Sequence, residues 1–378
     1  MIVGLLKEAG DERRVALLPE SVKALVDLKT KLMVESGAGS RAYISDESYK
    51  EVGAEVSTRE NILQNADVIV SIGVPSNEDL DKVKEEKVIL AVLQPLNNKE
   101  LVTNLLNRNL TSFSMDSIPR TSRAQTMDVL SSMATVAGYQ AVLRSAVHLP
   151  KFFPMFMTAA GTITPAKVLI LGAGVAGLQA VATARKLGAV VEVFDVRAAV
   201  KEEVESLGGK FVEVEGSKDE ASAGGYAVEQ DEEFKKKQKQ VIHDHAVKAD
   251  VIICTAQIPG RTAPLLITKE TVDGMKPGSV IVDLAASSGG NCEVTKNDVI
   301  YSYNDNITVI GDSNLPSTMP TDASKMFGKN VVNFMKLIID EEGNLNLNFE
   351  DDIVKGTCIT HNKEIYNEKV KDLLTQNA

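Results

Sequence analysis

Short apolar runs alternate with amphipathic segments through the N-terminal third of the chain. Five of these runs predict buried strands, at residues 2–6, 31–35, 67–72, 88–93 and 110–113. Between them, apolar residues recur at three- and four-residue steps, as in residues 20–28 and 98–107, which is typical of helices packed on a core. This regular alternation of strands and helices predicts an open parallel sheet.

The most informative stretch is KVLILGAGVAGLQAVATARKLGAVVEVFD, residues 167–195. An apolar run predicts a buried strand, and Gly172, Gly174 and Gly177 follow it with G-x-G-x-x-G spacing. A helical pattern then leads to a second strand, which ends at Asp195, placed to accept both ribose hydroxyls of an adenosine. The glycines allow a tight turn, close approach of the backbone to a pyrophosphate and close packing of the helix, whose N-terminus faces the phosphates. The unit predicts a dinucleotide-binding site.

Four more apolar runs complete a second sheet. With the two strands of the glycine-rich unit they predict a six-stranded sheet, and they lie at residues 211–214, 251–254, 280–284 and 307–310. A helical pattern at residues 322–339 has no strand to lead to, so we expect it to return to the first domain. The predicted fold is α/β, with two Rossmann-like open parallel-sheet domains linked by long helices. The predicted limits are 1–130 plus 318–378 for a discontinuous N-terminal domain and 131–317 for the dinucleotide-binding domain, and the polar residues 344–378 are expected to be in part a flexible tail.

A long helical pattern, residues 122–148, is expected to bridge the two domains. Polar side chains recur along it at three- and four-residue steps, at Gln125, Asp128, Ser132, Thr135 and Tyr139. This stripe is either a solvated face or, because a helix between two α/β domains lines their cleft, a surface that faces a ligand. Arg120 stands just before the helix, after Pro119, where a rigid start aims its side chain.

Between the third and fourth strands of the second sheet, residues 216–240 contain few apolar side chains. A loop of this length in a compact domain is usually functional or disordered. Tyr226 follows Gly224 and Gly225, and an aromatic side chain on a flexible hinge favours a lid over a bound ligand. The segment DEEFKKKQKQ, residues 231–240, is expected to begin a helix.

Composition narrows the class of protein. A length of 378 residues suits two domains, and a hydrophobic content of 44% is typical of a soluble globular chain. The net charge of −11 argues against nucleic acid or an anionic lipid surface as the main partner. The longest uncharged run, residues 168–184, is slightly short for a membrane span and is better explained by the strand and its glycines, and no signal peptide is apparent. Three cysteines, far apart and odd in number, predict neither a disulfide framework nor a metal site, which fits a reducing cytoplasm.

Several segments together carry a resemblance to a known family. They are KEAGDERRVALLPESV near the N-terminus, PRTSRAQTMDVLSSMATVAGYQAV, GAGVAGLQA with DVRAA, AGGYA, and KPGSVIVDLAASSGGN. Over nearly the whole chain they resemble the NAD(H)-binding alpha subunit, or domain I, of proton-translocating NAD(P) transhydrogenase, which belongs to the alanine dehydrogenase superfamily.

The resemblance implies an oxidoreductase subunit that binds NAD(H) and presents it for direct hydride transfer to or from NADP(H) held on a partner subunit. In the family this exchange is linked to proton translocation across a membrane. The implied partners are separate membrane-spanning and NADP(H)-binding transhydrogenase subunits and a second copy of the chain in a homodimer, with no nucleic acid. The implied location is cytoplasmic, peripheral at the inner face of the cytoplasmic membrane through those subunits.

The resemblance also implies roles for individual residues, and no metal site. The nicotinamide end would be positioned by the implied catalytic residues Arg120, Gln125, Asp128 and Ser131. The pyrophosphate region would be held by Gly172, Gly174, Val175, Ala176 and Gly177, and the adenosine ribose by Asp195, Val196 and Arg197. The mobile loop and the adenine side would include Gly225, Tyr226, Gln238 and Gln257. At Gln257 the chain departs from the family, in which a leucine is expected.

Two other functions stay open. An alanine dehydrogenase must handle a pyruvate carboxylate and move a proton, so we expect a lysine and a histidine where this chain has Gly73 and Gln94. Neither of these side chains acts as an acid or base near neutral pH. Hydride transfer between two nicotinamides moves no proton at the reacting carbons and needs the two rings held about 3–3.5 Å apart. The third reading is an NAD(H)-binding module without catalysis, to which no partner brings a second nicotinamide.

Overall fold

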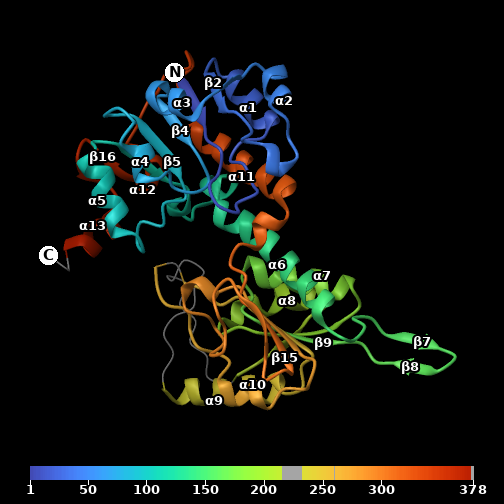
Figure 1. The fold of residues 1–378 in the computed structure, drawn as a ribbon. Helices are drawn as coiled ribbons and strands as arrows, with labels where there is room; N and C mark the ends of the chain where they lie inside the picture. The colour runs from blue at the N-terminus through green and yellow to red at the C-terminus, as the bar shows by residue number, and fades with distance from the viewer. Residues whose placement is uncertain (215–231, 259, 376–378) are drawn as a thin grey trace. The chain divides into compact units, whose positions relative to one another are not determined.

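The computed structural model describes residues 1–214, 232–258 and 260–375. The chain divides into two compact units, of which unit 1 comprises Met1–Met133 and Pro316–Ala378 and unit 2 comprises Ala134–Leu315 (Figure 1). Each unit contains its own mainly parallel sheet with helices on both faces. The predicted fold class, with two Rossmann-like sheets and a discontinuous first domain, is therefore confirmed.

Unit 2 is built on a seven-stranded sheet in the order β11-β10-β9-β12-β13-β15-β14. The predicted apolar runs form its parallel strands, β9 Lys167–Leu171, β10 Val190–Phe194, β11 Lys210–Val212, β12 Val251–Cys254, β13 Val280–Asp283 and β15 Ile307–Ile310. The prediction of six strands is wrong by one, because β14 (Ile300–Tyr303) pairs antiparallel with β15 at the sheet edge. Its side chains alternate between exposed and half-buried, so it lacks the continuous apolar run that marks a buried parallel strand.

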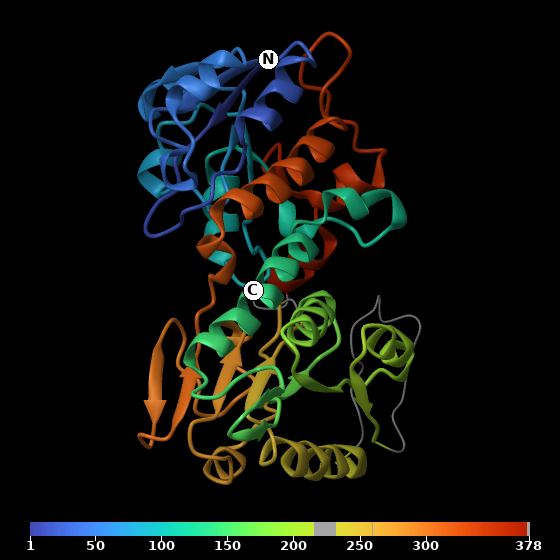
Figure 2. The ribbon, with the colours of Figure 1, turned by 90° about the vertical axis from the view of Figure 1, so that its right-hand side faces the viewer.

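Alternate side chains of the unit 2 strands face two helical layers (Figure 2). Val168 and Ile170 of β9 pack with α6, α7 and α8, whereas Leu169 and Leu171 pack with α9 and α10. Both faces of the sheet are thus covered, as parallel sheets require. These helices are α6 Val129–His148, α7 Val175–Lys186, α8 Lys201–Ser206, α9 Glu232–Ala246 and α10 Lys269–Asp273.

Unit 1 contains an eight-stranded sheet in the order β17-β16-β6-β5-β4-β1-β2-β3. Its parallel strands are β1 Ile2–Leu5, β2 Lys31–Glu35, β3 Glu55–Ser57, β4 Val68–Val70, β5 Val88–Ala91 and β6 Thr111–Ser114. Their order, 3-2-1-4-5-6, is the same as that of the parallel strands of unit 2 and is the doubly wound Rossmann order. The short strand β3 was not among the predicted strands.

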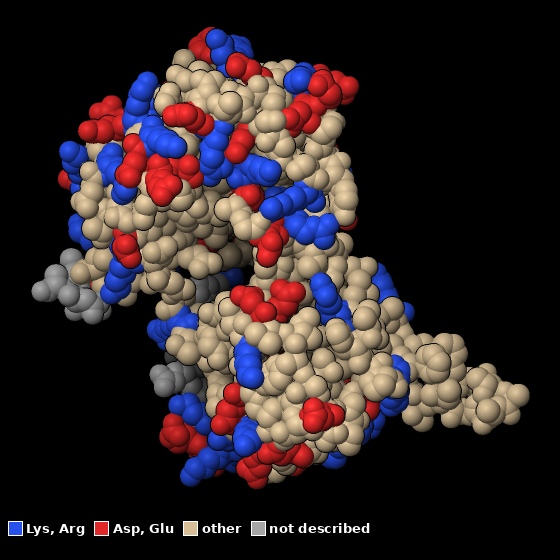
Figure 3. Space-filling model, viewed as in Figure 1, with Lys and Arg blue, Asp and Glu red and all other residues tan. Residues whose placement is uncertain are grey.

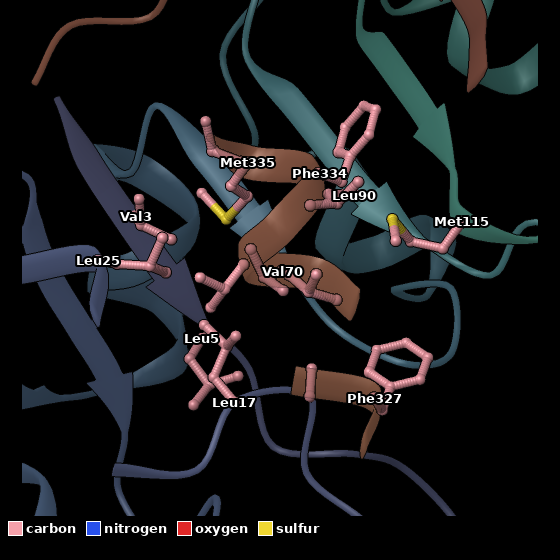
Figure 4. Close-up of a cluster of buried hydrophobic side chains, with 14 of the residues drawn as sticks. Val3, Leu5, Leu17, Leu25, Val70, Leu90, Met115, Phe327, Phe334 and Met335 are labelled. Carbon is pink, nitrogen blue, oxygen red and sulfur yellow. The ribbon is translucent and has the colours of Figure 1, made fainter. Parts of the chain in front are cut away.

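Helix α11 (Pro320–Met335) completes the larger core of unit 1. Figure 4 shows its Phe327, Phe334 and Met335 against side chains of β1, β4 and β5, including Leu5 and Val70. All of these side chains are buried, and α1 packs beside them on the same face. The other face is covered by α3, α4, α5 and α13. The bounds of the unit 1 helices are α1 Pro19–Val26, α2 Asp46–Glu51, α3 Arg59–Asn65, α4 Asn77–Leu80, α5 Lys99–Asn107, α12 Asp352–Thr357 and α13 Glu368–Thr375.

The prediction of a flexible tail over residues 344–378 is wrong for the described part, which ends at residue 375. Strand β16 (Cys358–His361) pairs antiparallel with β6, and β17 (Glu364–Ile365) follows it at the sheet edge. The polar side chains that suggested a tail are satisfied inside the sheet. The hydroxyl of Thr360 donates to the carbonyl of Leu110 at 2.8 Å and lies 2.7 Å from the hydroxyl of Ser112.

The helix predicted over residues 122–148 is wrong at its start. Ser122–Met127 form a short 3₁₀ helix, η3, and the backbone is extended at Asp128 before α6 begins at Val129. Asp128 caps α6, since its Oδ1 accepts the Ser131 backbone N–H at 2.9 Å and its Oδ2 accepts the Ser131 hydroxyl at 2.6 Å. An aspartate competes for helix N–H groups and so favours the start of a helix over its interior. The predicted polar stripe therefore does not lie along one continuous helix.

A hairpin that was not predicted projects from unit 2 (Figure 1). β7 (Phe156–Thr158) and β8 (Gly161–Ile163) pair only with each other. The side chains are apolar and exposed: Met157 is 79% exposed and Phe156 is 42% exposed. Residues 152–166 carry no charge, and the hairpin is an uncharged projection in Figure 3.

Within the described ranges, no helix combines the length and the apolar character that crossing a membrane requires.

Candidate functional site

The strand order of unit 2 reverses between β9 and β12, whose carboxyl ends are neighbours in the sheet. Gly172 follows β9 and Thr255 follows β12, and the Thr255 hydroxyl donates to the Gly172 carbonyl at 3.0 Å. Gly172 has φ +106°, a left-handed conformation that favours glycine. Open α/β sheets bind ligands at this reversal of strand order, the switch point. The predicted glycine-rich turn therefore lies where the fold favours a ligand.

The start of α7 is open to an anion. Gly174 is the N-cap of this helix, and no side chain caps it. A Cβ built on Gly174 would meet nothing within 4 Å, and the neighbouring Val175 is 42% exposed. The first N–H groups of a helix have no partner inside it and favour negative charge. The space beside Gly174 is therefore suited to a pyrophosphate lying against the backbone.

Two other glycines hold α7 in place. A Cβ on Gly177 would lie 1.9 Å from the carbonyl oxygen of Gly172, so only glycine lets the helix approach the turn this closely. On the other side, a Cβ on Gly138 of α6 would lie 2.1 Å from the carbonyl oxygen of Ala176. The first turn of α7 is thus fixed between the end of β9 and α6.

Asp195 lies directly beside the glycine-rich turn. Its Oδ1 accepts the backbone N–H and the Nε–H of Arg197, both at 2.9 Å. Its Oδ2 accepts the backbone N–H of Ala173 and the Nη2–H of Arg197, both at 2.7 Å. Each oxygen thus has two donors, which uses the accepting capacity of a carboxylate. A ribose hydroxyl can bind Asp195 only by replacing one of them, and the side chain of Arg197 is the part of this set that is free to rotate away. Val196, between them, is half-buried.

The sequence did not single out Asn291, which is fully buried and fixes the segment after β12. Its Oδ1 accepts the Ala256 N–H at 3.0 Å, and its Nδ2 donates to the carbonyls of Ala256 and Pro264 at 2.8 and 2.9 Å. The next residue along, Gln257, is exposed and donates to the Ser288 hydroxyl at 2.6 Å. The predicted Gln257 is therefore brought to the same sheet edge as the glycines.

Asp283, at the end of β13, holds Asn291 in turn. The carboxylate accepts the backbone N–H groups of Asn291 and Cys292 at 2.8 and 3.0 Å and the hydroxyl of Thr295 at 2.8 Å. Burial raises the pKa of Asp283, and these donors oppose the rise. Both Asp283 and Asn291 stand in the segment KPGSVIVDLAASSGGN, where an acid at a strand end followed by two glycines was the available signal.

Three predicted residues are not brought to this edge. Gly225 and Tyr226 fall outside the described residues, so the lid predicted around them is not described by the structure. Gln238 is half-buried on α9. Among the described residues, no hydrogen bond joins Gln238 to the glycine-rich turn.

The predicted nicotinamide residues lie in unit 1. Gln125 is exposed on η3, and Arg120 is exposed just before it. Asp128 and Ser131 are half-buried and bonded to each other in the cap of α6. The structure thus brings these four residues together in one short segment, 120–131, with two side chains exposed and two engaged in the helix start.

Unit 1 has a switch point of its own, between β1 and β4. Glu8 follows β1, is 8% exposed, and accepts the backbone N–H groups of Ile72 and Gly73 at 2.6 and 3.0 Å. Burial raises the pKa of Glu8 to about 7, and the two N–H groups oppose the rise. A Cβ on Gly73 would lie 3.5 Å from Glu8 Oε2. The N–H groups at the end of β4 are thus bound by the chain itself, whereas the start of α7 is left open.

Comparison with known proteins follows this geometry. The models "Alanine dehydrogenase/PNT, N-terminal domain" and "Alanine dehydrogenase/PNT, C-terminal domain" match residues 4–137 and 141–368. An NAD(P) transhydrogenase subunit alpha protein of Rhodospirillum rubrum is 47% identical over 363 residues, 94% of each chain. The NAD(P) transhydrogenase subunit alpha of Haemophilus influenzae is 42% identical, covering 96% of this chain and 71% of its own.

Solved structures agree. The crystal structure of transhydrogenase from Sinorhizobium meliloti superposes with a TM-score of 0.88 at 42% identity, covering 97% of this chain and 100% of its own. An L-alanine dehydrogenase superposes with a TM-score of 0.84 at 24% identity over the whole of both chains, which shows a shared fold.

Proposed function

The chain belongs to the alanine dehydrogenase/PNT family and, within it, to the alpha subunits of NAD(P) transhydrogenase, and from this premise we propose that it binds NAD(H) and presents it for direct hydride transfer to or from NADP(H) on a partner subunit. The resemblance noted from the sequence is confirmed, and the chain is an oxidoreductase subunit. The observation that carries the proposal is the uncapped start of α7, with open space at Gly174 and the carboxylate of Asp195 beside it.

The residues of the chain then bind and orient the nucleotide, which itself supplies or accepts the hydride. The N–H groups at the start of α7 bind the pyrophosphate, and Asp195 accepts the adenosine ribose hydroxyls in exchange for Arg197. Gln125 and Asp128 orient the nicotinamide ring. No proton moves at the reacting carbons, so these side chains need only fix geometry.

The partners we propose are membrane-spanning and NADP(H)-binding subunits, through which the chain is held at the inner face of the cytoplasmic membrane. Hydride exchange is linked there to proton translocation. The same proposal includes a homodimer in which the hairpin β7–β8 packs on the second copy, since that hairpin is apolar, exposed and uncharged.

Replacing Asp195 with asparagine is expected to weaken NADH binding by roughly 2 kcal/mol, because hydrogen bonds to a carboxylate are stronger than hydrogen bonds to a neutral amide. The carboxylate also repels a 2′-phosphate, so the wild-type chain is expected to prefer NADH to NADPH. Fluorescence titration with both nucleotides measures both effects. Arg197→Ala is the control, since it removes the ion pair and retains the carboxylate. Equal or tighter binding of NADPH by the wild type would contradict the assignment.

Gln125→Asn and Asp128→Ala are expected to lower the rate of hydride transfer at least about tenfold, or ~1.4 kcal/mol of barrier. NADH affinity is expected to change much less, because the adenosine side supplies most of the binding. Single-turnover kinetics with the NADP(H)-binding partner provide the measurement. Asp128→Asn keeps an acceptor for the Ser131 N–H and so controls for loss of the α6 cap. Unchanged transfer in both variants would assign these side chains to a solvated surface.

An alanine dehydrogenase activity is not supported by unit 1. Gly73 offers no side chain beside Glu8, and Gln94, after β5, is not titratable. The isolated chain is therefore expected to form no NADH from alanine and NAD. Alanine-dependent formation of NADH would favour the dehydrogenase, and nucleotide binding without transfer to partner-bound NADP would favour a module without catalysis.

Met157→Asp is expected to convert the dimer to a monomer, because a carboxylate on β7 would have to be desolvated in the apolar interface. Analytical ultracentrifugation of the full chain measures the change. Leu265→Asp is the control, since Leu265 is 51% exposed and lies outside the hairpin. A monomeric wild type, or a dimer unaffected by Met157→Asp, would contradict the proposed interface.

A further inference from the structure

The short helix η3, which carries Gln125, has a weak internal structure. A 3₁₀ helix of this length has poorer hydrogen-bond geometry than an α-helix and needs support from its surroundings. Its inner face supplies some support, because Ala124 and Met127 are buried in the unit 1 core. Gln125 lies between these two anchors and is exposed. The position of its side chain therefore depends on what holds the outer face of η3.

The outer face is held at Arg123, two residues before Gln125. The guanidinium of Arg123 makes two parallel hydrogen bonds to Asp351, Nη1 to Oδ2 and Nη2 to Oδ1, both at 2.7 Å. Asp351 is itself fixed, since its Oδ1 caps α12 by accepting the N–H groups of Ile353 and Val354 at 2.8 and 3.3 Å. A two-pronged contact to a fixed carboxylate restrains both the position and the orientation of the guanidinium.

The other end of η3 is held from α11. The carbonyl of Thr126, directly after Gln125, accepts the Nδ2–H groups of Asn330 and Asn333 at 2.8 and 3.2 Å. Asn330 is 6% exposed, so this contact is shielded from water. Supports from α11 and α12 thus bracket Gln125 on both sides, about 200 residues away along the chain.

We propose that Arg123 is a positioning residue for hydride transfer, which acts through Gln125 by fixing η3 to the cap of α12. This role rests on the proposed function, in which Gln125 orients the nicotinamide ring. A displacement of a positioning group on the scale of 1 Å slows a reaction without removing the chemistry. Loss of the Arg123–Asp351 contact is therefore expected to affect transfer more than nucleotide binding.

The test uses the full chain with its NADP(H)-binding partner and measures the single-turnover transfer rate, the NADH dissociation constant and the melting temperature. Arg123→Gln is expected to lower the rate about fivefold while the dissociation constant changes less than about twofold. Asp351→Asn keeps an acceptor for the α12 cap and is expected to show the same loss. The double variant is expected to lose no more than either single variant, because the two changes remove one contact. Arg123→Lys is expected to restore part of the rate.

Arg108→Gln is the matched control, since it removes a comparable surface ion pair, Arg108 to Asp81, from the same unit. It is expected to leave transfer unchanged. A wild-type rate in Arg123→Gln, additive losses in the double variant, or parallel losses of rate, affinity and melting temperature would overturn the positioning role. A wild-type chain that exchanges no hydride with partner-bound NADP(H) would overturn the proposed function and this role with it.

Discussion

Gly177→Ala is expected to destabilise unit 2 by about 3 kcal/mol and to weaken NADH binding about 100-fold. The added Cβ would stand 1.9 Å from the carbonyl oxygen of Gly172 and 2.9 Å from its carbonyl carbon, so backbone must move. Overpacking of this kind costs typically about 1–3 kcal/mol, and the backbone that moves is the turn proposed to hold the pyrophosphate. A 100-fold change in dissociation constant is about 2.7 kcal/mol. Urea unfolding and NADH titration measure the two losses.

Gly174→Ala separates the two effects within the same turn. A Cβ at Gly174 meets nothing within 4 Å, and the residue does not have a positive φ, so stability is expected to stay within about 0.5 kcal/mol of the wild type. NADH binding is nevertheless expected to weaken, because the methyl group would occupy the space proposed for the pyrophosphate. Wild-type affinity in Gly174→Ala would show that the nucleotide does not approach this backbone. Wild-type stability in Gly177→Ala would contradict the packing argument.

The second large effect expected is on the pH dependence of stability, and it comes from Glu8. Burial raises the pKa of Glu8 from 4.5 to about 7 in the folded chain. Between these values the folded chain binds a proton at Glu8 and the unfolded chain does not. The free energy of unfolding contributed by Glu8 is therefore fully present below about pH 4.5, falls as the pH rises, and is lost above about pH 7. The loss is expected to be roughly 3 kcal/mol.

Glu8→Gln isolates this contribution, because glutamine does not titrate and the other ionisable groups are common to both chains. The difference in the free energy of unfolding, wild type minus Glu8→Gln, is expected to fall between pH 4.5 and 7 and to be level above that range. Urea unfolding at intervals of half a pH unit provides the measurement. A difference that stays constant across this range would show that Glu8 is ionised throughout.

The parallel strands of both sheets were largely predictable because burial on two faces leaves a continuous apolar run. Strand β14 was missed because it lies at an edge, where half of its side chains face water. Strand β16 was missed for a different reason: Thr360 is polar, but it is buried and bonded to Ser112 and Leu110, which are about 250 residues earlier in the chain. Local patterns do not report partners at that distance.

The site was predictable to the same extent. Gly172, Gly177 and Asp195 follow a local pattern whose spacing has a mechanical cause, and the structure brings them together. Arg123 and Asn291 carry no such pattern, since each acts on a segment distant in sequence. The start of α6 was misplaced because three-residue spacing is shared by a helix face and by the cap in which Asp128 accepts the Ser131 N–H.

The discontinuity of unit 1 has a consequence for synthesis on the ribosome. Domains fold as units while the chain emerges from its N-terminus, but Phe327, Phe334 and Met335 of α11 complete the unit 1 core only after all of unit 2 has been made. At roughly 5–20 residues per second, this interval is roughly 10–40 s. Unit 2 is continuous and is complete first, while the sheet face formed by Leu5, Val70 and their neighbours waits uncovered. The nascent chain is therefore expected to be most prone to aggregation, and most dependent on chaperones, during this interval.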